Sequence, residues 1–202
     1  MSECRVTEDL TQQIEQAMAN GWSATRAARE YVQRGGNGSL SQAETVFRTE
    51  INRANGEAYM ADGERTPGFG GWRYLLSPVH PRPDICDLLS TQNLYGLGPG
   101  VYPDRTRTPW PAHPNTLSFV EIVFADEITE ADRVGKETSL QALARLTPEQ
   151  RVGVLGKTEA GYFDRGLLRA WMIRSKPSVV TIRLKRQGLL LDLSTNCRDL
   201  GT

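Results

Sequence analysis

The feature that most constrains the fold is a proline-rich segment in the middle of the chain, from Thr66 to Asn115. This segment holds nine of the eleven prolines, six glycines and both histidines. Proline fixes φ and removes a backbone donor, so we expect little regular helix or sheet there. The segment also carries many large apolar side chains, among them Trp72, Tyr74 and Trp110, which are costly to leave in water. We therefore predict an ordered but irregular structure rather than a polar linker.

The chain before this segment carries three helical patterns. The spacing of apolar residues predicts helices over residues 7–19, 23–32 and 41–61. The third pattern is the clearest, because Ser41 and Glu44 have the spacing of a capping box. Its apolar stripe consists of Val46, Phe47, Ile51, Ala54 and Ala58.

The chain after the segment mixes strand and helix patterns. Residues 118–124 alternate as a strand, with Val120, Ile122 and Phe124 forming a wholly apolar side. Helices are predicted over 139–146, from Thr147 with Pro148 in the first turn and Gln150 in the capping box, and over 157–173 with a break at Gly166. Residues 178–184 and 189–193 have the pattern of a hairpin.

These patterns predict an α+β fold with a helical N-terminal part, an irregular stapled centre and a C-terminal part of short helices with a small sheet or hairpin. We assign residues 1–38 to an N-terminal helical extension and residues 39–202 to the main domain. Within that domain the irregular segment covers 66–117 and the C-terminal α/β part covers 118–202.

The charge balance argues against a protein that coats nucleic acid along its whole surface. The 24 Lys and Arg residues equal the 24 Asp and Glu residues in number. Basic residues nevertheless gather toward the C-terminus without an acidic neighbour, and they are either a solvated face or candidates for contact with DNA. These candidates are Arg165, Arg169, Arg174, Lys176, Arg183, Lys185 and Arg186.

The three cysteines, Cys4, Cys86 and Cys197, are too few and too widely spaced for a disulfide framework. They fit a reducing cytoplasm. The N-terminal residues lack the apolar region of a secretory signal, and no apolar run approaches the length of a membrane span, so we expect no membrane association.

Three runs in the proline-rich segment resemble the central signature of the phage Mu F-like head morphogenesis family, whose members are minor head proteins. They are Val79-His80-Pro81-Arg82-Pro83-Asp84-Ile85-Cys86-Asp87, Leu97-Gly98-Pro99-Gly100-Val101-Tyr102-Pro103 and Ala112-His113-Pro114-Asn115. The preceding Arg48-Thr49-Glu50 helix and the later Arg151-Val152-Gly153-Val154-Leu155-Gly156 run are also similar to the family. The resemblance covers roughly residues 10–175.

The resemblance implies a role in assembly of the phage head, in the head interior of the virion and, before that, in the host cytoplasm. It implies the portal protein and the major capsid or scaffold protein as partners. Contact with phage DNA and several copies per virion are further expectations of the same kind.

The same runs contain residues that can bind a metal. His80, Cys86 and His113 are suitable zinc ligands, with Asp87 or Asp84 as a fourth, and a structural zinc would order a proline-rich segment. Many members of the family carry cysteines after the second His-Pro, where this chain has Thr116 and Ser118. The alternative is that both histidines bond backbone groups and that Cys86 is a small buried apolar residue.

An enzyme is the competing hypothesis, either a metal-dependent hydrolase or nuclease, or a toxin-like ADP-ribosyltransferase. The sequence shows no His-Glu-x-x-His motif, no nucleophile elbow and no Glu-x-Glu pair. The glycines at 96, 98 and 100 lack the Lys-Ser/Thr ending of a phosphate-binding loop. We therefore predict a structural protein without catalytic residues.

Overall fold

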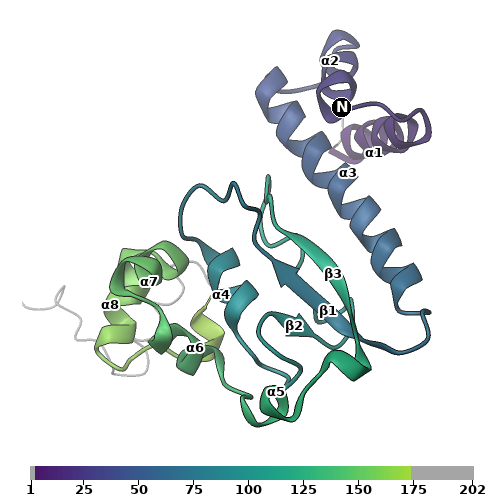
Figure 1. Ribbon diagram of the computed structural model, residues 1–202. Coiled ribbons are helices and arrows are strands. Elements are labelled where there is room, and N and C mark those ends of the chain that lie inside the picture. The colour runs from purple at the N-terminus through teal and green to yellow at the C-terminus, as the bar shows by residue number, and fades with distance from the viewer. Residues whose placement is uncertain (1–2, 174–202) are drawn as a thin grey trace, which may run out of the picture.

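The computed structural model describes residues 3–173, and its fold is α+β as expected (Figure 1). Three helices come first, and a small antiparallel sheet, one helix between its strands and a group of short helices follow. In chain order the elements are α1 (Glu3–Ala19), α2 (Ala24–Gln33), α3 (Leu40–Gly63), β1 (Phe69–Leu75), α4 (Ile85–Thr91), β2 (Val101–Tyr102), β3 (Phe119–Phe124), the 3-10 turn η1 (Ala125–Glu127), α5 (Glu130–Val134), α6 (Ser139–Arg145), α7 (Pro148–Leu155), α8 (Lys157–Asp164) and the 3-10 turn η2 (Ala170–Met172).

The proline-rich segment is ordered and for the most part irregular, as expected, but it also holds short regular elements that its composition does not predict. It contains β1, α4 and β2. The prolines lie outside these elements, where a missing backbone donor breaks no ladder or helix bond. Pro81 and Pro83, for example, precede α4, and Pro99 precedes β2. The composition of the whole fifty-residue segment does not reveal that proline-rich turns alternate with short helices and strands within it.

The sheet has the strand order β2-β1-β3, with both neighbours antiparallel to β1. Trp72 pairs with Ile122 and Tyr74 with Val120, so these side chains share one face of the sheet. Trp72 and Tyr74 are fully buried, and α4 packs against β1. Tyr74 belongs to a core with Cys86 and Leu89 of α4, so the sheet holds α4 in place.

Helix α3 is shared by two cores. Its first half packs Ala43 and Phe47 against α1 and α2. Its second half packs against indole rings, because Gly56 and Gly63 leave room for them. An ideal Cβ at Gly56 would lie 1.9 Å from the Trp110 ring, and one at Gly63 would lie 2.3 Å from the Trp72 ring. The buried face therefore changes along the helix, and this change explains three errors in the sequence-based stripe. Val46 and Ala58 are exposed, while Met60 is buried.

The start of α3 also differs from the prediction. Ser39, not Ser41, is the N-cap, and it forms the capping box with Gln42. Both Ser-x-x-Gln and Ser-x-x-Glu patterns occur in this stretch, and the earlier one begins the helix.

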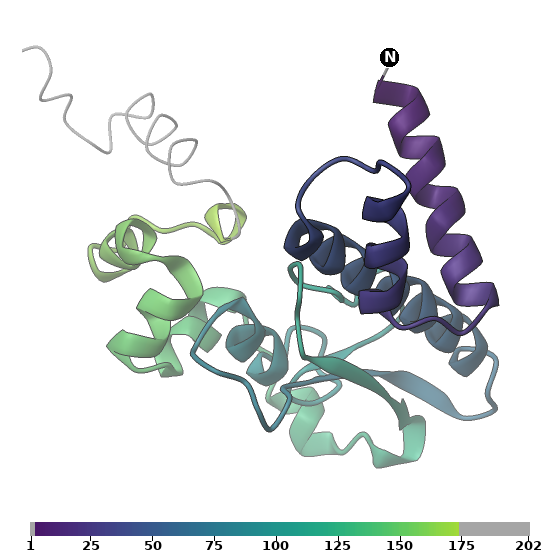
Figure 2. The ribbon, with the colours of Figure 1, turned by 90° about the horizontal axis from the view of Figure 1, so that it is seen from above.

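The C-terminal helices form a third core around Leu88, Leu143, Tyr162, Leu168 and Met172. The capping box of Thr147 and Gln150 with Pro148 at the helix start is confirmed. The helix predicted over 157–173 ends at Asp164, and Gly166 follows with φ of +69°. The hairpin predicted over 178–193 lies outside the described residues. The N-terminal helices and α6–α8 lie at opposite ends of the described chain, with α4 and the sheet between them (Figures 1 and 2). No helix among residues 3–173 is long and apolar enough to cross a bilayer.

Candidate metal centre at the start of helix α4

Helix α4 begins with a capping box made of two aspartates. Asp84 is the N-cap, and its Oδ1 accepts a hydrogen bond of 2.7 Å from the Cys86 amide. Asp87 Oδ2 accepts in return from the Asp84 amide at 2.8 Å. The box satisfies two amides that a helix start leaves without partners. It also fixes the direction of both carboxylates and leaves Asp84 Oδ2 for another contact.

His113, from the third family-like run, supplies that contact. Its Nε2 lies 3.2 Å from Asp84 Oδ2 and 3.3 Å from Cys86 Sγ. Its Nδ1 lies 2.9 Å from the Pro114 carbonyl oxygen. The carboxylate, thiol and imidazole thus meet at one point, although 27 residues separate Cys86 from His113.

The contacts of His113 leave one conflict to resolve. With Nδ1 facing a carbonyl oxygen, which only accepts, a neutral ring would carry its proton on Nδ1. Nε2 would then face the Asp84 carboxylate as one acceptor against another. A proton shared between Nε2 and Asp84 Oδ2, or a cation bound between the three groups, removes this conflict.

His80 forms a second group that shares Asp84 with the first. Its Nε2 lies 3.0 Å from Asp87 Oδ2 and 3.7 Å from Asp84 Oδ1. Asp87 therefore joins His80 to the capping box and does not reach the contact of Cys86 with His113. The two groups are Asp84-Cys86-His113 and His80-Asp84-Asp87, and within each the potential ligand atoms lie within 4.8 Å of one another.

Cys86 is enclosed, although its neighbours in the cluster are not. Its side chain is fully buried, and the Tyr74 hydroxyl donates a hydrogen bond of 3.1 Å to Sγ. Burial raises the pKa of the Cys86 thiol, and burial likewise raises the pKa of Tyr74. Thr116 Oγ1 lies 3.6 Å from Sγ. Thr116 is thus in contact with Cys86.

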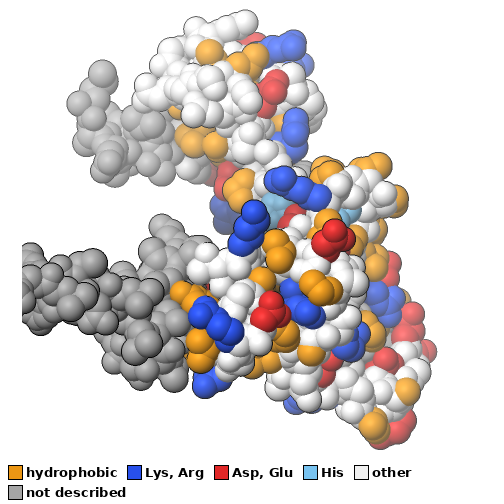
Figure 3. All heavy atoms as spheres, turned by 90° about the vertical axis from the view of Figure 1, so that its left-hand side faces the viewer, with side chains coloured by type: hydrophobic (Ala, Val, Ile, Leu, Met, Phe, Trp, Pro, Cys, Tyr) orange, Lys and Arg blue, Asp and Glu red, His pale blue; other side chains and the backbone are white. Residues whose placement is uncertain are grey.

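A surface pocket of about 420 Å³ opens beside the cluster and is lined by Arg82, Pro83, Asp84, His113 and Gly153. Gly153 of α7 touches the loop closely, since an ideal Cβ there would lie 2.4 Å from the Pro83 carbonyl oxygen. On this side of the molecule, histidine side chains reach the surface next to basic ones (Figure 3). The cluster is thus buried on the side of the Cys86 thiol and open to solvent on the side of Asp84 and His113.

The donor set fits a zinc ion. In a tetrahedral site, nitrogen and oxygen ligands lie about 3.4 Å apart, and nitrogen and sulfur ligands about 3.6 Å apart. The corresponding distances from His113 Nε2 are 3.2 Å to Asp84 and 3.3 Å to Cys86. A thiolate, an imidazole and a carboxylate are also the ligands that zinc prefers. Asp84, Cys86 and His113 are therefore the residues that would hold the ion. Asp87 and His80 contact Asp84 on the side away from the ion and help to fix its position.

The first and third of the family-like runs meet in this cluster, and the second packs next to it. Tyr102 of β2 donates a hydrogen bond of 2.9 Å to the Leu89 carbonyl oxygen of α4. No family model, no curated protein and no solved structure matches this chain.

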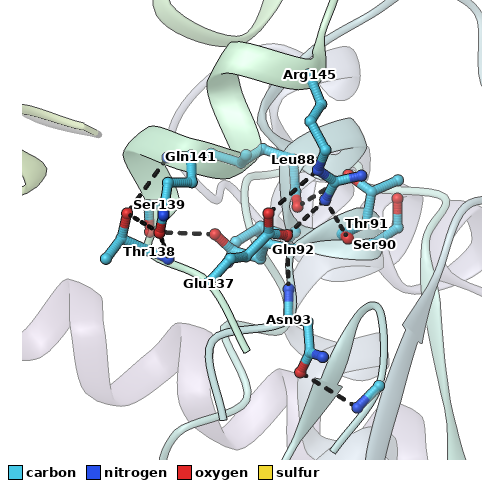
Figure 4. Close-up of polar contacts among 12 residues, drawn as sticks. Leu88, Ser90, Thr91, Gln92, Asn93, Glu137, Thr138, Ser139, Gln141 and Arg145 are labelled. Atoms are coloured by element: carbon cyan, nitrogen blue, oxygen red, sulfur yellow. Dashed lines mark hydrogen bonds and ion pairs between the residues drawn. The ribbon is translucent and has the colours of Figure 1, made fainter. Parts of the chain in front are cut away.

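The other end of α4 is fixed by a polar network that sequence reasoning missed. Asn93 donates through Nδ2 to the Asp132 carbonyl oxygen at 2.7 Å and accepts at Oδ1 from the Gly98 amide at 3.2 Å. Glu137 accepts from the Asn93 amide and from the guanidinium of Arg145, which also donates to the Thr91 carbonyl oxygen (Figure 4). We call Asn93, Glu137 and Arg145 the polar staple. No motif marks it, because its members are spread over more than fifty residues.

Two of the predicted DNA-contact residues are described, and both are exposed. Arg165 lies over the Tyr162 ring and donates to the Gly161 carbonyl oxygen, while Arg169 lies near the Gly166 carbonyl oxygen. The remaining candidates, Arg174, Lys176, Arg183, Lys185 and Arg186, lie outside the described residues.

Proposed function

We propose that this chain is an assembly and interaction protein, namely a minor head protein of a tailed bacteriophage. The observation that carries the proposal is the convergence of the family-like runs on helix α4. Cys86 of the first run contacts His113 of the third, and Tyr102 of the second bonds the carbonyl of Leu89. If the signature is structural, its residues are expected to contact one another or the same element. The three runs meet this expectation at α4.

The surroundings of Cys86 favour a structural role over a nucleophilic one. A reactive cysteine needs an exposed side chain and a lowered thiol pKa. Cys86 is fully buried and its thiol pKa is raised. We therefore propose that the Asp84-Cys86-His113 cluster binds a structural zinc, which holds the loop around His113 against the start of α4.

A groove of about 440 Å³ between α3 and the start of β3 supports a role in docking. Tyr59, Leu117 and Phe119 lie along it, and each is close to half exposed. Large aromatic and aliphatic side chains of this kind are typical of surfaces that a protein partner covers. Under the proposal the partner is the portal protein or the major capsid or scaffold protein, and the chain is located in the head interior.

The proposal is tested in the phage itself. Purified virions and procapsids are digested and searched for peptides of this chain, and the gene is then deleted and the heads are counted by electron microscopy. We expect the peptides in the particles and defective heads without the gene. Particles that lack the peptides, together with normal heads after deletion, would contradict the proposal. Genes for a portal and a major capsid protein beside this gene are the expected setting.

A further inference from the structure

The candidate metal centre offers three protein ligands, whereas a closed tetrahedral site needs four. His80 does not complete the set, because its Nε2 approaches Asp84 and Asp87 rather than Cys86 or His113. Thr116 Oγ1 contacts Cys86, but a neutral hydroxyl is not among the side chains that zinc sites ordinarily use. Within residues 3–173, the fourth position is therefore left to a ligand from outside this cluster.

The exposed side of the cluster indicates where such a ligand enters. Asp84 and His113 line the pocket of about 420 Å³, while Cys86 does not. About one third of the surface of each of the two side chains remains accessible. A ligand that reaches the ion between Asp84 and His113 thus comes through this pocket.

Arg82 indicates the charge of that ligand. It lines the same pocket, and among the described residues it forms no ion pair. A thiolate and a carboxylate already neutralise the charge of a zinc ion, so another cation close by favours an anionic fourth ligand. Arginine is such a cation, and its fork-shaped donor set pairs well with a carboxylate.

We propose that the fourth position is filled by a carboxylate from an aspartate or glutamate of the docking partner, with Arg82 binding the second oxygen. This inference rests on the proposed zinc site and on the assembly role. It makes the pocket of Arg82, Pro83, Asp84, His113 and Gly153 a docking surface that is complete only in the assembled state. Because the partner supplies the last ligand, the loop around His113 is fully held in place only after assembly.

The experiment uses the whole chain loaded with Co²⁺, which reports its ligands by absorbance. We expect a thiolate charge-transfer band that disappears in Cys86→Ser. Acetate should change the visible bands of the wild-type protein, and Arg82→Ala should weaken acetate binding by roughly five- to tenfold while leaving binding of neutral imidazole unchanged. Arg133→Ala, which removes an exposed arginine of α5 that does not line the pocket, is the matched control and should leave acetate binding as in the wild type.

Each other outcome overturns a separate part of the account. A thiolate band with no response to acetate or imidazole means a closed site, so the inference fails while the zinc site stands. No thiolate band at all removes the zinc site as well. Tighter binding of inorganic phosphate than of acetate replaces the partner carboxylate by a nucleic acid phosphate. Hydrolysis of bis(4-nitrophenyl) phosphate by the zinc form, lost in His113→Ala, contradicts the assembly role itself.

Discussion

The two ends of helix α4 are fixed by polar groups in opposite ways. At its C-terminal end, in the polar staple, donors face acceptors: Asn93 donates to the Asp132 carbonyl and accepts from the Gly98 amide. At its N-terminal end, the acceptors of His113 and Asp84 face each other at 3.2 Å. The first end is complete once the chain has folded, whereas the second requires a proton or a metal ion from solution. Only the second end should therefore respond to metal.

The largest effect is expected at the polar staple. Asn93→Ala removes two hydrogen bonds of a buried amide and leaves the Asp132 carbonyl and the Gly98 amide without these partners. We expect a loss of about 3 kcal/mol in the free energy of unfolding, from the cost of unpaired buried groups. Urea unfolding followed by tryptophan fluorescence measures it, and the loss should be the same with zinc and with chelator.

A matched control lies in the neighbouring helix. Glu130→Ala breaks an exposed pair with Arg133, whose atoms lie 3.7 Å apart. The free energy of unfolding should change by less than about 0.5 kcal/mol. A loss of unfolding free energy as large as that of Asn93→Ala would show that the location of the substitution, and not the loss of buried hydrogen bonds, determines its effect.

The second effect tests the support behind the candidate metal centre. Asp87→Ala removes the acceptor for the Asp84 amide and for His80. Loss of the Asp87 half of the capping box should lower the free energy of unfolding by about 1 kcal/mol without metal. Zinc affinity should also fall about 10- to 100-fold, as for other groups that orient ligands. A competition titration with a chromophoric chelator measures the affinity, and an unchanged value would place Asp87 outside the site.

A third change should strengthen the site. Thr116→Cys places a thiol where Oγ1 now lies 3.6 Å from Cys86 Sγ. Under reducing conditions we expect zinc affinity to rise about tenfold, because a thiolate is a far better zinc ligand than a hydroxyl. The same competition titration measures the gain, with Thr116→Ser as the control. Equal affinity in both variants would show that position 116 does not reach the ion.

The smallest effect is the pH dependence of the metal-free protein. Burial raises the pKa of Cys86 above that of the unfolded chain. A raised thiol pKa means that the unfolded state loses its proton first, so stability is full below about pH 8.5 and declines as the pH rises. Cys86→Ala should flatten this decline between about pH 8.5 and 10. Urea unfolding at a series of pH values measures it, and an identical slope in the variant contradicts the assignment.

Local sequence patterns predicted the elements whose signals lie within a few residues. Thr147, Pro148 and Gln150 mark the start of α7, and the strand over residues 118–124 is found as β3 at Phe119–Phe124. The family-like runs likewise predict Cys86 and His113 in one candidate site, and the two side chains are in contact in the structure.

The failures have a common physical origin in contacts between distant segments. The sequence leaves Asp87 and Asp84 as alternatives for the fourth ligand. The capping box of α4 favours Asp84, and the sequence does not predict this box because its prolines argue against a helix there. Gly56 and Gly63 lack side chains and so leave room for the indole rings of Trp110 and Trp72. The sequence alone does not show that these rings pack there. The polar staple depends on Asn93 meeting Glu137, and no local pattern connects these two residues.

The central claim, that a metal ion rather than a proton joins Asp84, Cys86 and His113, is tested most directly by the stability of the whole chain with and without zinc. At a zinc concentration 100 times the dissociation constant, we expect the free energy of unfolding to rise by about 2.7 kcal/mol. Cys86→Ser and Asp84→Asn should lose this gain. Equal stability with zinc and with chelator in the wild-type protein would assign the contact to a protonated histidine and contradict the claim.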